Sequence, residues 1–357
     1  MPGSCHRPIG GFKVVFEYAN RLVKKGHNIT IVCAAISDIK MTYYERLIRK
    51  IYYLYRYFTR TYLPNRWFNL DPAVKILWLP CLHPSMFPEA DIYVATAWKT
   101  VEYINKYPIR CGKKIILFMD YEYYMSASDT LKERIKSVYP NKGKYICISS
   151  VIEKMLHNWG IADVACIPIA LDQSVFYKEI NIDDPKRIWL GFPTRPEKHK
   201  RTEKAIEAIN IVKNKYQKPI CVWSFGGKPT IKIPNWIKYY RHPSDETLRK
   251  LYNNTAIFIT PSQYEGWGLP GTEAMACGCA LISTDHGGIN SYAVHNNNAL
   301  ICQVDDVEQI ARNILILLND NEMRMHIAGN AVKDIKRFSW DESVLMFEKA
   351  IQNLFYG

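Results

Sequence analysis

The sequence predicts an α/β protein with two domains, each built around a parallel β-sheet. Short β-branched and apolar runs alternate with amphipathic helical segments along nearly the whole chain, an order typical of parallel sheets. At 357 residues, of which 48% are hydrophobic, the chain is long enough for two domains with separate cores. The predicted strands include 29–35, 74–79, 92–95, 114–119 and 145–149 in the first half, and 187–192, 220–225, 256–260 and 280–284 in the second.

The composition favours a soluble protein that binds anions. The net charge of +13 suits nucleotide sugars, acidic membrane surfaces or nucleic acid, and charge alone does not choose among them. Ten cysteines occur without metal-binding spacing, so we expect them to be reduced and the protein to be cytoplasmic. No apolar run reaches the roughly 18 residues of a membrane-spanning helix, and the start is no signal peptide. We therefore expect a soluble protein that is at most peripheral to the membrane.

A pair of glycines near the start precedes the first predicted helix. Gly10 and Gly11 lead into an amphipathic segment over Phe12–Lys25, which Gly26 is expected to end. Adjacent glycines at a helix start allow the backbone to approach a ligand closely, although a Gly-Gly pair is also common in ordinary turns. Only Met1–Arg7 comes before this loop, and Pro2 and Gly3 are poor strand formers.

Residues 41–68 form a basic and aromatic segment. Six arginines and lysines stand against a single acidic residue, Glu45, and tyrosine, leucine and isoleucine lie between them. Such a helix suits the interface of an anionic membrane, or an acidic polymer. The alternative is a solvated helix whose tyrosines pack on the domain. The cations are Arg46, Arg49, Lys50, Arg56, Arg60 and Arg66.

Two carboxylates follow the predicted strand 114–119. Asp120 and Glu122 come directly after it, at the edge of the sheet where ligands of parallel sheets bind. Either of them could bind or deprotonate a substrate hydroxyl. The alternative is a structural carboxylate that caps the next helix.

Two cations follow the first predicted strand of the second half. Arg195 and Lys200 stand five residues apart, between the strand at 187–192 and a helix over 203–215. Fixed cations at a strand end suit a diphosphate leaving group, on which negative charge builds as its bond breaks. Lys198 competes with Lys200 for this role, and a solvated run of charges is the alternative.

Residues 256–284 read as strand, loop, helix and strand. Pro270 suits the first turn of the helix, because its missing N–H would have no partner there, and Gly278 suits the helix end. The amides of Gly271 and Thr272 would then favour a phosphate. Glu265 on the loop and Glu273 in the first turn suit hydroxyls beside that phosphate. The alternative is that Glu273 complements the helix dipole and Glu265 is solvated.

The pattern PSxxEGWGLPxxEAMACG in this segment resembles the signature of retaining glycosyltransferases of the GT-B fold, family 4 type (group 1). FMDYEYY, around Asp120, resembles a motif of rhamnosyltransferase-like branches. The resemblance implies two facing Rossmann-like domains with a cleft between them. Residues 1–168 would bind the acceptor, residues 169–337 the nucleotide sugar, and a terminal helix over 338–357 would cross back to the first domain.

The resemblance also implies roles for individual residues. Glu265 would hold the sugar near its reacting carbon, Glu273 the ribose hydroxyls, and Gly10 and Gly11 would face the donor phosphates. No metal and no cofactor are implied, and the partners are a nucleotide-sugar donor and a glycan or lipid-linked acceptor. The donor-binding residues would be Gly10, Gly11, Arg195, Lys200, Gly226, His242, Glu265, Gly268, Leu269, Pro270, Gly271, Thr272 and Glu273, and the catalytic ones Glu265, Arg195, Lys200, Asp120 and Glu122.

The chain departs from this family at three places. The strand that normally precedes the glycine loop is missing, so either the start is truncated or another segment fills its place. Thr194 and Arg201 stand where the family has glycines, and no histidine occupies the usual place near Asp120. Two other function classes stay open on these grounds: a module that binds nucleotide sugars without turnover, and, on charge alone, a nucleic-acid-binding protein.

Overall fold

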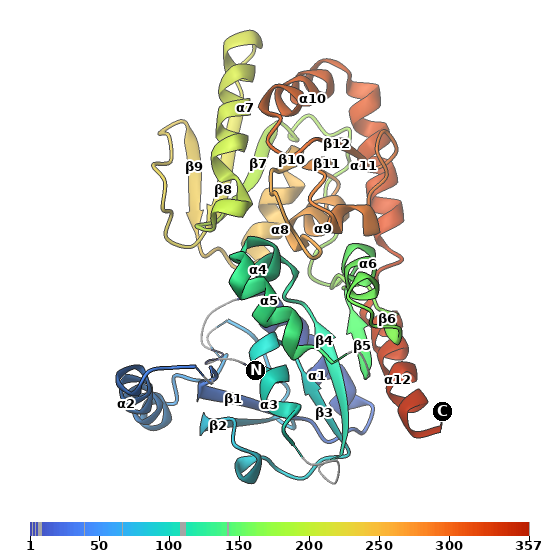
Figure 1. Ribbon diagram of the computed structural model, residues 1–357. Coiled ribbons are helices and arrows are strands. Elements are labelled where there is room, and N and C mark those ends of the chain that lie inside the picture. The colour runs from blue at the N-terminus through green and yellow to red at the C-terminus, as the bar shows by residue number, and fades with distance from the viewer. Residues whose placement is uncertain are drawn as a thin grey trace. The chain divides into compact units, whose positions relative to one another are not determined.

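The computed structural model describes residues 1–357 except 2, 4, 6–8, 39, 66, 108–111, 141–142 and 357. The chain divides into two compact units. Unit 1 comprises Met1–Ile148, Ile152–Ile167 and Asp341–Gly357, and unit 2 comprises Ser149–Val151 and Pro168–Trp340. The strands of both units pair in parallel, as the alternation of strands and helices predicts (Figure 1).

Unit 1 holds two parallel sheets. One has the order β1-β2 and the other β3-β4-β5-β6. Its strands are β1 (Thr30–Ile36), β2 (Lys75–Cys81), β3 (Ile92–Ala95), β4 (Lys113–Phe118), β5 (Lys144–Cys147) and β6 (Val164–Cys166). Its helices are α1 (Gly10–Lys24), α2 (Tyr43–Thr59), α3 (Trp98–Ile104), α4 (Tyr121–Ser126), α5 (Asp129–Val138), α6 (Ser150–Asn158) and α12 (Trp340–Tyr356), with the short 3-10 helix η1 (Pro84–Met86).

The beginning of the chain lies beside β1. The amino group of Met1 donates to the carbonyl of Val32, and the Gly3 N–H donates to that of Ala34 at 3.2 Å. Cys5 is fully buried there, with its sulfur 2.8 Å from that of Cys33. The described residues at this end thus donate to alternate carbonyls of β1 without forming a strand. The expectation that Pro2 disfavours a strand concerns a residue outside the described ones, as does the boundary at Arg7.

Helix α12 packs on unit 1. The rings of Tyr18 and Phe347 lie 4.8 Å apart, and Glu348 forms ion pairs with Lys25 and His27. The end of the chain therefore belongs to the same unit as its beginning.

Unit 2 is built on one six-stranded parallel sheet with the order β12-β11-β10-β7-β8-β9. Its strands are β7 (Trp189–Thr194), β8 (Cys221–Gly226), β9 (Ile237–Arg241), β10 (Thr255–Thr260), β11 (Ala280–Thr284) and β12 (Ala299–Cys302). Its helices are α7 (Thr202–Lys215), α8 (Asp245–Asn253), α9 (Leu269–Ala276), α10 (Val307–Asn319) and α11 (Asn321–Ile335), with the 3-10 helices η3 (Lys198–Lys200) and η4 (Gly288–Ser291).

Both faces of this sheet are buried. On β10, Ile257 and Ile259 belong to the cluster that helices α7 and α10 complete. Phe258 points to the opposite face, because side chains alternate along a strand, and its ring lies 5.1 Å from that of Tyr252 on α8. Burial on both faces explains why the strands of unit 2 are continuous apolar runs in the sequence.

Among the boundaries that differ from the predicted ones, three change the place of residues named above. Helix α1 begins at Gly10, so both glycines lie inside its first turn instead of in a loop before it. Strand β7 begins at Trp189 and leaves Arg187 outside. Helix α2 ends at Thr59, well before residue 68, with Arg60 in the left-handed conformation at φ 51°. A left-handed residue after the last turn is a usual way for a helix to end.

Candidate active site

The strand order of unit 2 reverses between β7 and β10. From β7 the chain moves outward through β8 and β9, then returns to β10 on the other side of β7 and moves outward again. In open parallel sheets the loops that follow two such strands diverge and leave room for a ligand. The loop after β7 carries Arg195 and Lys200, and the loop after β10 carries Glu265. The fold therefore places the loop with Arg195 and Lys200 beside the loop with Glu265.

Direct contacts join these two loops. The Lys200 Nζ atom lies 2.8 Å from Oε2 of Glu265, and both side chains are only 14% exposed. The Gln263 N–H donates to the His199 carbonyl at 2.7 Å. Lys198, the competing lysine, is exposed. The structure therefore places Lys200, and not Lys198, against the carboxylate.

Arg195 lies at the ends of two strands. Its guanidinium donates to the carbonyls of Thr194 on β7 and Phe225 on β8, each at 3.3 Å, and it sits 5.1 Å from the centre of the Phe225 ring. Its own N–H donates to Thr202 Oγ1 at 3.1 Å, at the first residue of α7. The half-buried cation is thus held in place by the strand ends and the helix start.

Glu265 is fixed by its side chain and by its backbone. The Ser262 hydroxyl donates to its Oε1 at 2.7 Å, opposite the oxygen that Lys200 contacts. Its N–H donates to the His286 carbonyl, and its carbonyl accepts from the Gly288 N–H, both at 3.1 Å. The carboxylate therefore has a defined orientation, with one oxygen toward a cation.

Helix α9 begins and ends where the sequence predicts. Gly268, at φ 100°, precedes it, Pro270 is in its first turn, and Gly278, at φ 88°, follows it. A side chain at Gly268 would also crowd Tyr292, since a Cβ there would lie 3.0 Å from that hydroxyl. The Gly271 N–H donates to the Gly268 carbonyl at 3.0 Å, so this amide already has a partner within the first turn.

The rest of the first turn of α9 is mostly enclosed. Thr272 is 1% exposed and its hydroxyl donates to the Leu269 carbonyl at 2.9 Å, whereas Leu269 and Pro270 are half-buried. Phosphate binding by the amides of Gly271 and Thr272 stays a prediction, and the two cations are the more accessible part of the anion site.

Glu273 has a partner that the sequence did not indicate. It is buried, and the hydroxyl of Tyr252 donates to its Oε2 at 3.2 Å. Tyr252 comes from α8 and is fully buried, and burial raises its pKa well above the ordinary value. Tyr252 therefore stays neutral and serves as a permanent donor that orients the carboxylate.

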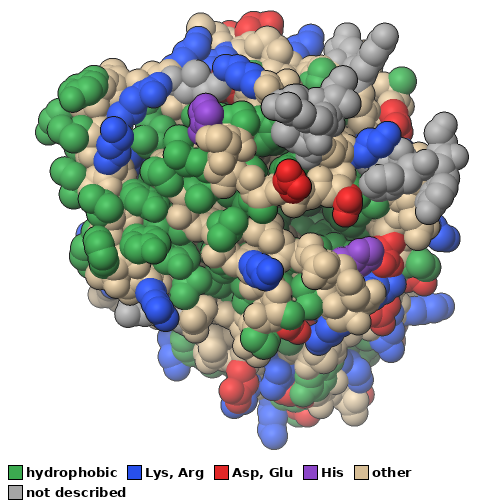
Figure 2. Space-filling view, turned by 90° about the horizontal axis from the view of Figure 1, so that it is seen from below, with side chains coloured by type: hydrophobic (Ala, Val, Ile, Leu, Met, Phe, Trp, Pro, Cys, Tyr) green, Lys and Arg blue, Asp and Glu red, His purple; other side chains and the backbone are tan. Residues whose placement is uncertain are grey.

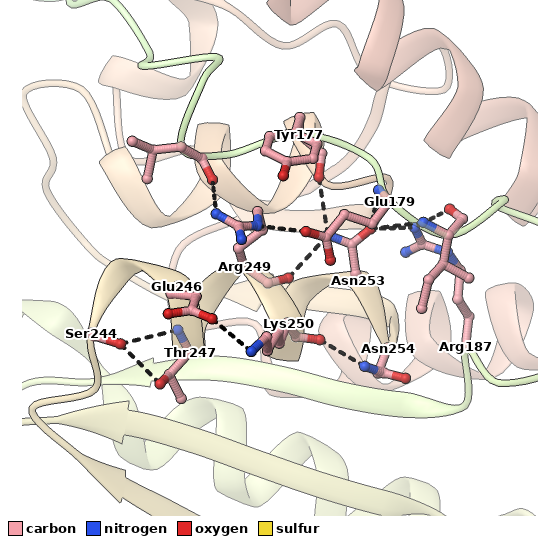
Figure 3. A network of polar contacts seen from close by, with 12 residues as sticks. Tyr177, Glu179, Arg187, Ser244, Glu246, Thr247, Arg249, Lys250, Asn253 and Asn254 are labelled. Atoms are coloured by element: carbon pink, nitrogen blue, oxygen red, sulfur yellow. Dashed lines mark hydrogen bonds and ion pairs between the residues drawn. The ribbon is translucent and has the colours of Figure 1, made fainter.

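Arg187 fixes the opposite end of α9. Its guanidinium donates to the carbonyls of Cys277 at 2.7 Å and Gly278 at 3.2 Å, at the C-terminus of that helix. It also reaches the side chain of Asn253, the last residue of α8, at 3.4 Å. Figure 3 shows the contacts of Arg187 and Asn253 on the α8 side, where the Asn253 amide donates in turn to the carbonyls of Tyr177 and Arg249. Arg187 thus ties together the helices that carry Glu273 and Tyr252.

Two further predicted residues lie together at the end of β8. The His242 N–H donates to the Gly226 carbonyl at 2.8 Å. Gly226 lies so close to β7 that a Cβ would be 2.0 Å from the Thr194 carbonyl oxygen, so only glycine fits there. His242 is exposed, at φ 48°. This gives Gly226 a packing role, whether or not it binds a ligand.

The remaining predicted residues belong to unit 1. Gly11 lies against β4, because a Cβ there would be 3.9 Å from Met119 Cε. Asp120 and Glu122 begin the segment after that strand, Glu122 in the first turn of α4. The N-terminus of α1 and the two carboxylates therefore gather around the end of β4, and Gly10 is exposed beside them.

Asp120 does not cap the helix that follows it. Its Oδ2 accepts the N–H of Trp98, the first residue of α3, at 2.5 Å. Burial raises the pKa of Asp120 to about 6, against the lowering effects of the Trp98 N–H, the Tyr139 hydroxyl and the charge of Lys99. A carboxyl with a pKa near neutrality can exchange a proton with a hydroxyl, as a general base must.

The described residues include neither a possible metal cluster nor a membrane-spanning helix. Among the residues that the structure describes, no group of three or more His, Cys, Asp or Glu could hold a metal ion. None of the described helices is long and apolar enough to cross a membrane.

The sequence of unit 2 matches a known protein family. Residues 176–334 match the family model described as "Glycosyl transferases group 1". The chain is 25% identical to an uncharacterized glycosyltransferase of Methanocaldococcus jannaschii, over 63% of this chain and 65% of the relative. It is 34% identical to an O-antigen chain mannosyltransferase B of Escherichia coli, over 30% of this chain and 27% of the relative. The chain thus spans less than two thirds of these relatives.

Solved structures show the same fold over the whole chain. Sucrose-phosphate synthase from Thermosynechococcus elongatus gives a TM-score of 0.74 at 15% identity, over 98% of this chain and 94% of that structure. HepE of Anabaena, solved in complex with UDP-glucose, gives 0.72 at 13% identity, over 100% and 98%. The predicted GT-B fold is confirmed.

Proposed function

We propose that this chain, whose residues 176–334 belong to the glycosyl transferases group 1 family, transfers a sugar from a nucleotide-diphosphate sugar to a hydroxyl acceptor. The observation that carries the proposal is the pairing of Lys200 with Glu265, where the strand order of unit 2 reverses. A cation and a carboxylate side by side suit a substrate that is anionic at its phosphates and gains positive charge at its reacting carbon.

The cations would act on the leaving group. As the bond between the sugar carbon and the diphosphate oxygen breaks, negative charge grows on that oxygen. Arg195 and Lys200 are held by neighbouring groups before any substrate arrives, so little reorganisation is needed to stabilise this charge. On this proposal the reaction requires no metal ion, because the two cations supply the charge that a divalent ion supplies elsewhere.

The two carboxylates would have separate tasks. Glu273 lies on α9 with Tyr252 orienting it, and would bind the ribose hydroxyls, which do not react. Glu265 contacts Lys200 directly. A bound diphosphate carries more negative charge than one carboxylate and would compete for Lys200. Glu265 could then turn to the sugar, where it stabilises the positive charge of the transition state.

We propose retention of configuration at the sugar carbon. The signature around Glu265 and Glu273 resembles that of retaining enzymes. Among the described residues of unit 2, Glu273 is buried against Tyr252 and Glu265 stabilises the transition-state charge on this proposal, so neither is assigned as the nucleophile of a covalent intermediate. Attack by the acceptor from the face of the leaving group is then the route to retention. The acceptor oxygen then forms the new bond, and its proton passes to the departing diphosphate oxygen.

The acceptor would be a glycan or a lipid-linked sugar, and the product a polysaccharide or glycoconjugate. The O-antigen mannosyltransferase among the relatives supports this class. In unit 1, Asp120 and Glu122 are the candidates to bind the acceptor hydroxyl, and Gly10 and Gly11 the candidates to approach the donor phosphates. The raised pKa of Asp120 supports its part, because it favours proton exchange near neutral pH.

The test is nucleotide release by the purified protein. A panel of radiolabelled nucleotide sugars, first ranked by thermal shift, would be incubated with lipid-linked and soluble glycan acceptors. We expect one donor to yield free nucleoside diphosphate and a glycosylated acceptor whose new linkage keeps the donor's anomeric configuration. Tight donor binding without release would instead identify a binding module, and binding of nucleic acid at moderate salt without nucleotide-sugar binding would contradict the proposal.

A further inference from the structure

Helix α2 turns its apolar side chains to the solvent. Of its 17 residues, only Arg56 is buried and only Tyr53 is half-buried. Exposed apolar and aromatic side chains recur at intervals of three and four residues, the spacing of one helix face. Tyr44, Ile51 and Phe58, which are seven residues or about two helical turns apart, are 71%, 63% and 78% exposed. The other members of this apolar stripe are Leu47, Ile48, Leu54 and Tyr55.

The apolar stripe is not a poorly packed core face. The helix is held on unit 1 by its other side, where the rings of Tyr53 and Trp78 stack with their centres 6.0 Å apart. The backbone carbonyl of Tyr53 accepts the Trp78 indole N–H at 3.1 Å. Arg56 turns inward and donates to the Thr61 carbonyl at 2.9 Å. The inner side of α2 is therefore already packed on unit 1, and the apolar stripe lies on the side that faces away from it.

The exposed surface of α2 also carries basic residues. Arg49, Lys50 and Arg60 are exposed on α2 or directly after it, and Glu45 is the single acidic residue of the helix. The carboxylate of Glu45 closes a capping box with Thr42. Figure 2 shows hydrophobic side chains gathered on the side where α2 lies, with lysine and arginine side chains among them. This combination fits a surface that is apolar inside and negatively charged at its boundary.

We propose that α2 docks unit 1 onto an anionic lipid bilayer, lying in the plane of the interface. At about 1.5 Å per residue, the helix is roughly 25 Å long, too short to span the hydrocarbon and long enough to lie along it. The apolar stripe would enter the boundary between headgroups and acyl chains, and Arg49, Lys50 and Arg60 would reach anionic headgroups. The proposal rests on this surface alone and is independent of glycosyl transfer.

The test is sedimentation of the purified full chain with vesicles at low ionic strength. Vesicles of phosphatidylcholine and phosphatidylglycerol would be compared with pure phosphatidylcholine. We expect binding to the anionic vesicles and little to the neutral ones. The Arg49→Ser/Lys50→Ser variant should weaken binding about 25-fold, since each cation near an anionic surface contributes about fivefold. Its control, Lys186→Ser/Lys218→Ser, removes the same charge from exposed positions of unit 2 and should bind like the native protein.

The apolar stripe is tested separately. Ile51→Ser/Phe58→Ser should weaken binding at least about tenfold, because both side chains would leave the acyl region. Ile188→Ser/Val294→Ser is the control, since these side chains are 55% and 57% exposed in unit 2. All four variants change exposed residues, and an unchanged thermal unfolding midpoint would verify that they fold.

Three outcomes would overturn the proposal: no binding of the native protein to anionic vesicles, equal losses in the variants and their controls, or a second copy of the chain on the stripe. The last would appear in light scattering as a dimer that ignores vesicles and that Ile51→Ser/Phe58→Ser converts to a monomer.

Discussion

Lys200 and Glu265 stand 65 residues apart in the sequence, yet the Lys200 ammonium lies 2.8 Å from the Glu265 carboxylate. Each lies on a loop that follows one of two neighbouring strands, β7 and β10. Ser262 holds the other oxygen of the same carboxylate. Both oxygens of the Glu265 carboxylate are therefore held in place, one of them by the Lys200 cation.

Removing the cation should slow turnover much more than removing its exposed neighbour. We expect Lys200→Ala to lower kcat by about 100-fold or more, as loss of one preorganised charge contact does at other leaving groups. Lys198→Ala is the matched control, because Lys198 lies in the same short helix η3 and is exposed. Steady-state nucleotide release measures both, and a loss confined to Lys198→Ala would show that the wrong lysine is assigned.

The two carboxylates should fail in different ways. We expect Glu273→Gln to raise KM for the donor and weaken nucleoside diphosphate binding, because its partners would be the unreactive ribose hydroxyls. Glu265→Gln should instead lower kcat with little change in nucleotide affinity, since its interaction grows only in the transition state. Calorimetry with the nucleoside diphosphate, beside steady-state rates, separates the two effects. The reverse pattern would exchange the roles assigned here.

Arg187 should be essential to the stability of unit 2 without touching the substrate. Its buried guanidinium makes seven hydrogen bonds, six of them to backbone carbonyls. Arg187→Met removes all seven of these hydrogen bonds from acceptors around the guanidinium, so we expect a loss of about 3 kcal/mol or more in the free energy of unfolding. The neighbouring Lys186→Met should change it by less than about 0.5 kcal/mol. Urea unfolding measures both, and equal effects would contradict the role of Arg187.

Asp120 should make stability depend on pH in a defined window. Its pKa is raised from 3.8 to about 6 in the folded protein. The folded state therefore binds this proton more tightly than the unfolded state does. The resulting stabilisation is complete below pH 3.8 and is lost as the pH rises through about 6.

Asp120→Asn removes that dependence while keeping an oxygen for the Trp98 N–H. Relative to the native protein, the variant should gain up to about 3 kcal/mol in the free energy of unfolding between pH 4 and pH 7, at about 1.4 kcal/mol per pKa unit. Unfolding curves at a series of pH values measure the difference. A difference that stays constant over this range would mean that the carboxyl is ionised throughout, and would weaken the case for Asp120 as a base.

Local signals in the sequence were sufficient for the elements and for part of the site. Pro270 and Gly278 fixed the two ends of α9, because a missing N–H and a positive φ are properties of those residues wherever they stand. The start of α8 has a similarly local cause, because the Ser244 hydroxyl accepts the Thr247 N–H at 3.2 Å. The sequence pattern around Glu265 and Glu273 was sufficient to indicate the resemblance to the family, and that resemblance indicated the fold.

Other features of the site and of α2 depended on which segments pack together. Packing between segments far apart in the sequence cannot be read from a local pattern. The choice of Lys200 over Lys198 required β7 to lie beside β10. The partners Tyr252 and Arg187 come from elsewhere in unit 2 and carry no motif, so sequence reasoning missed them. For α2, the sequence determined an amphipathic basic helix, and only the tertiary structure decided that its apolar face points outward. The reason is that the inner contact is made by Tyr53, Arg56 and Trp78 instead of by the apolar stripe.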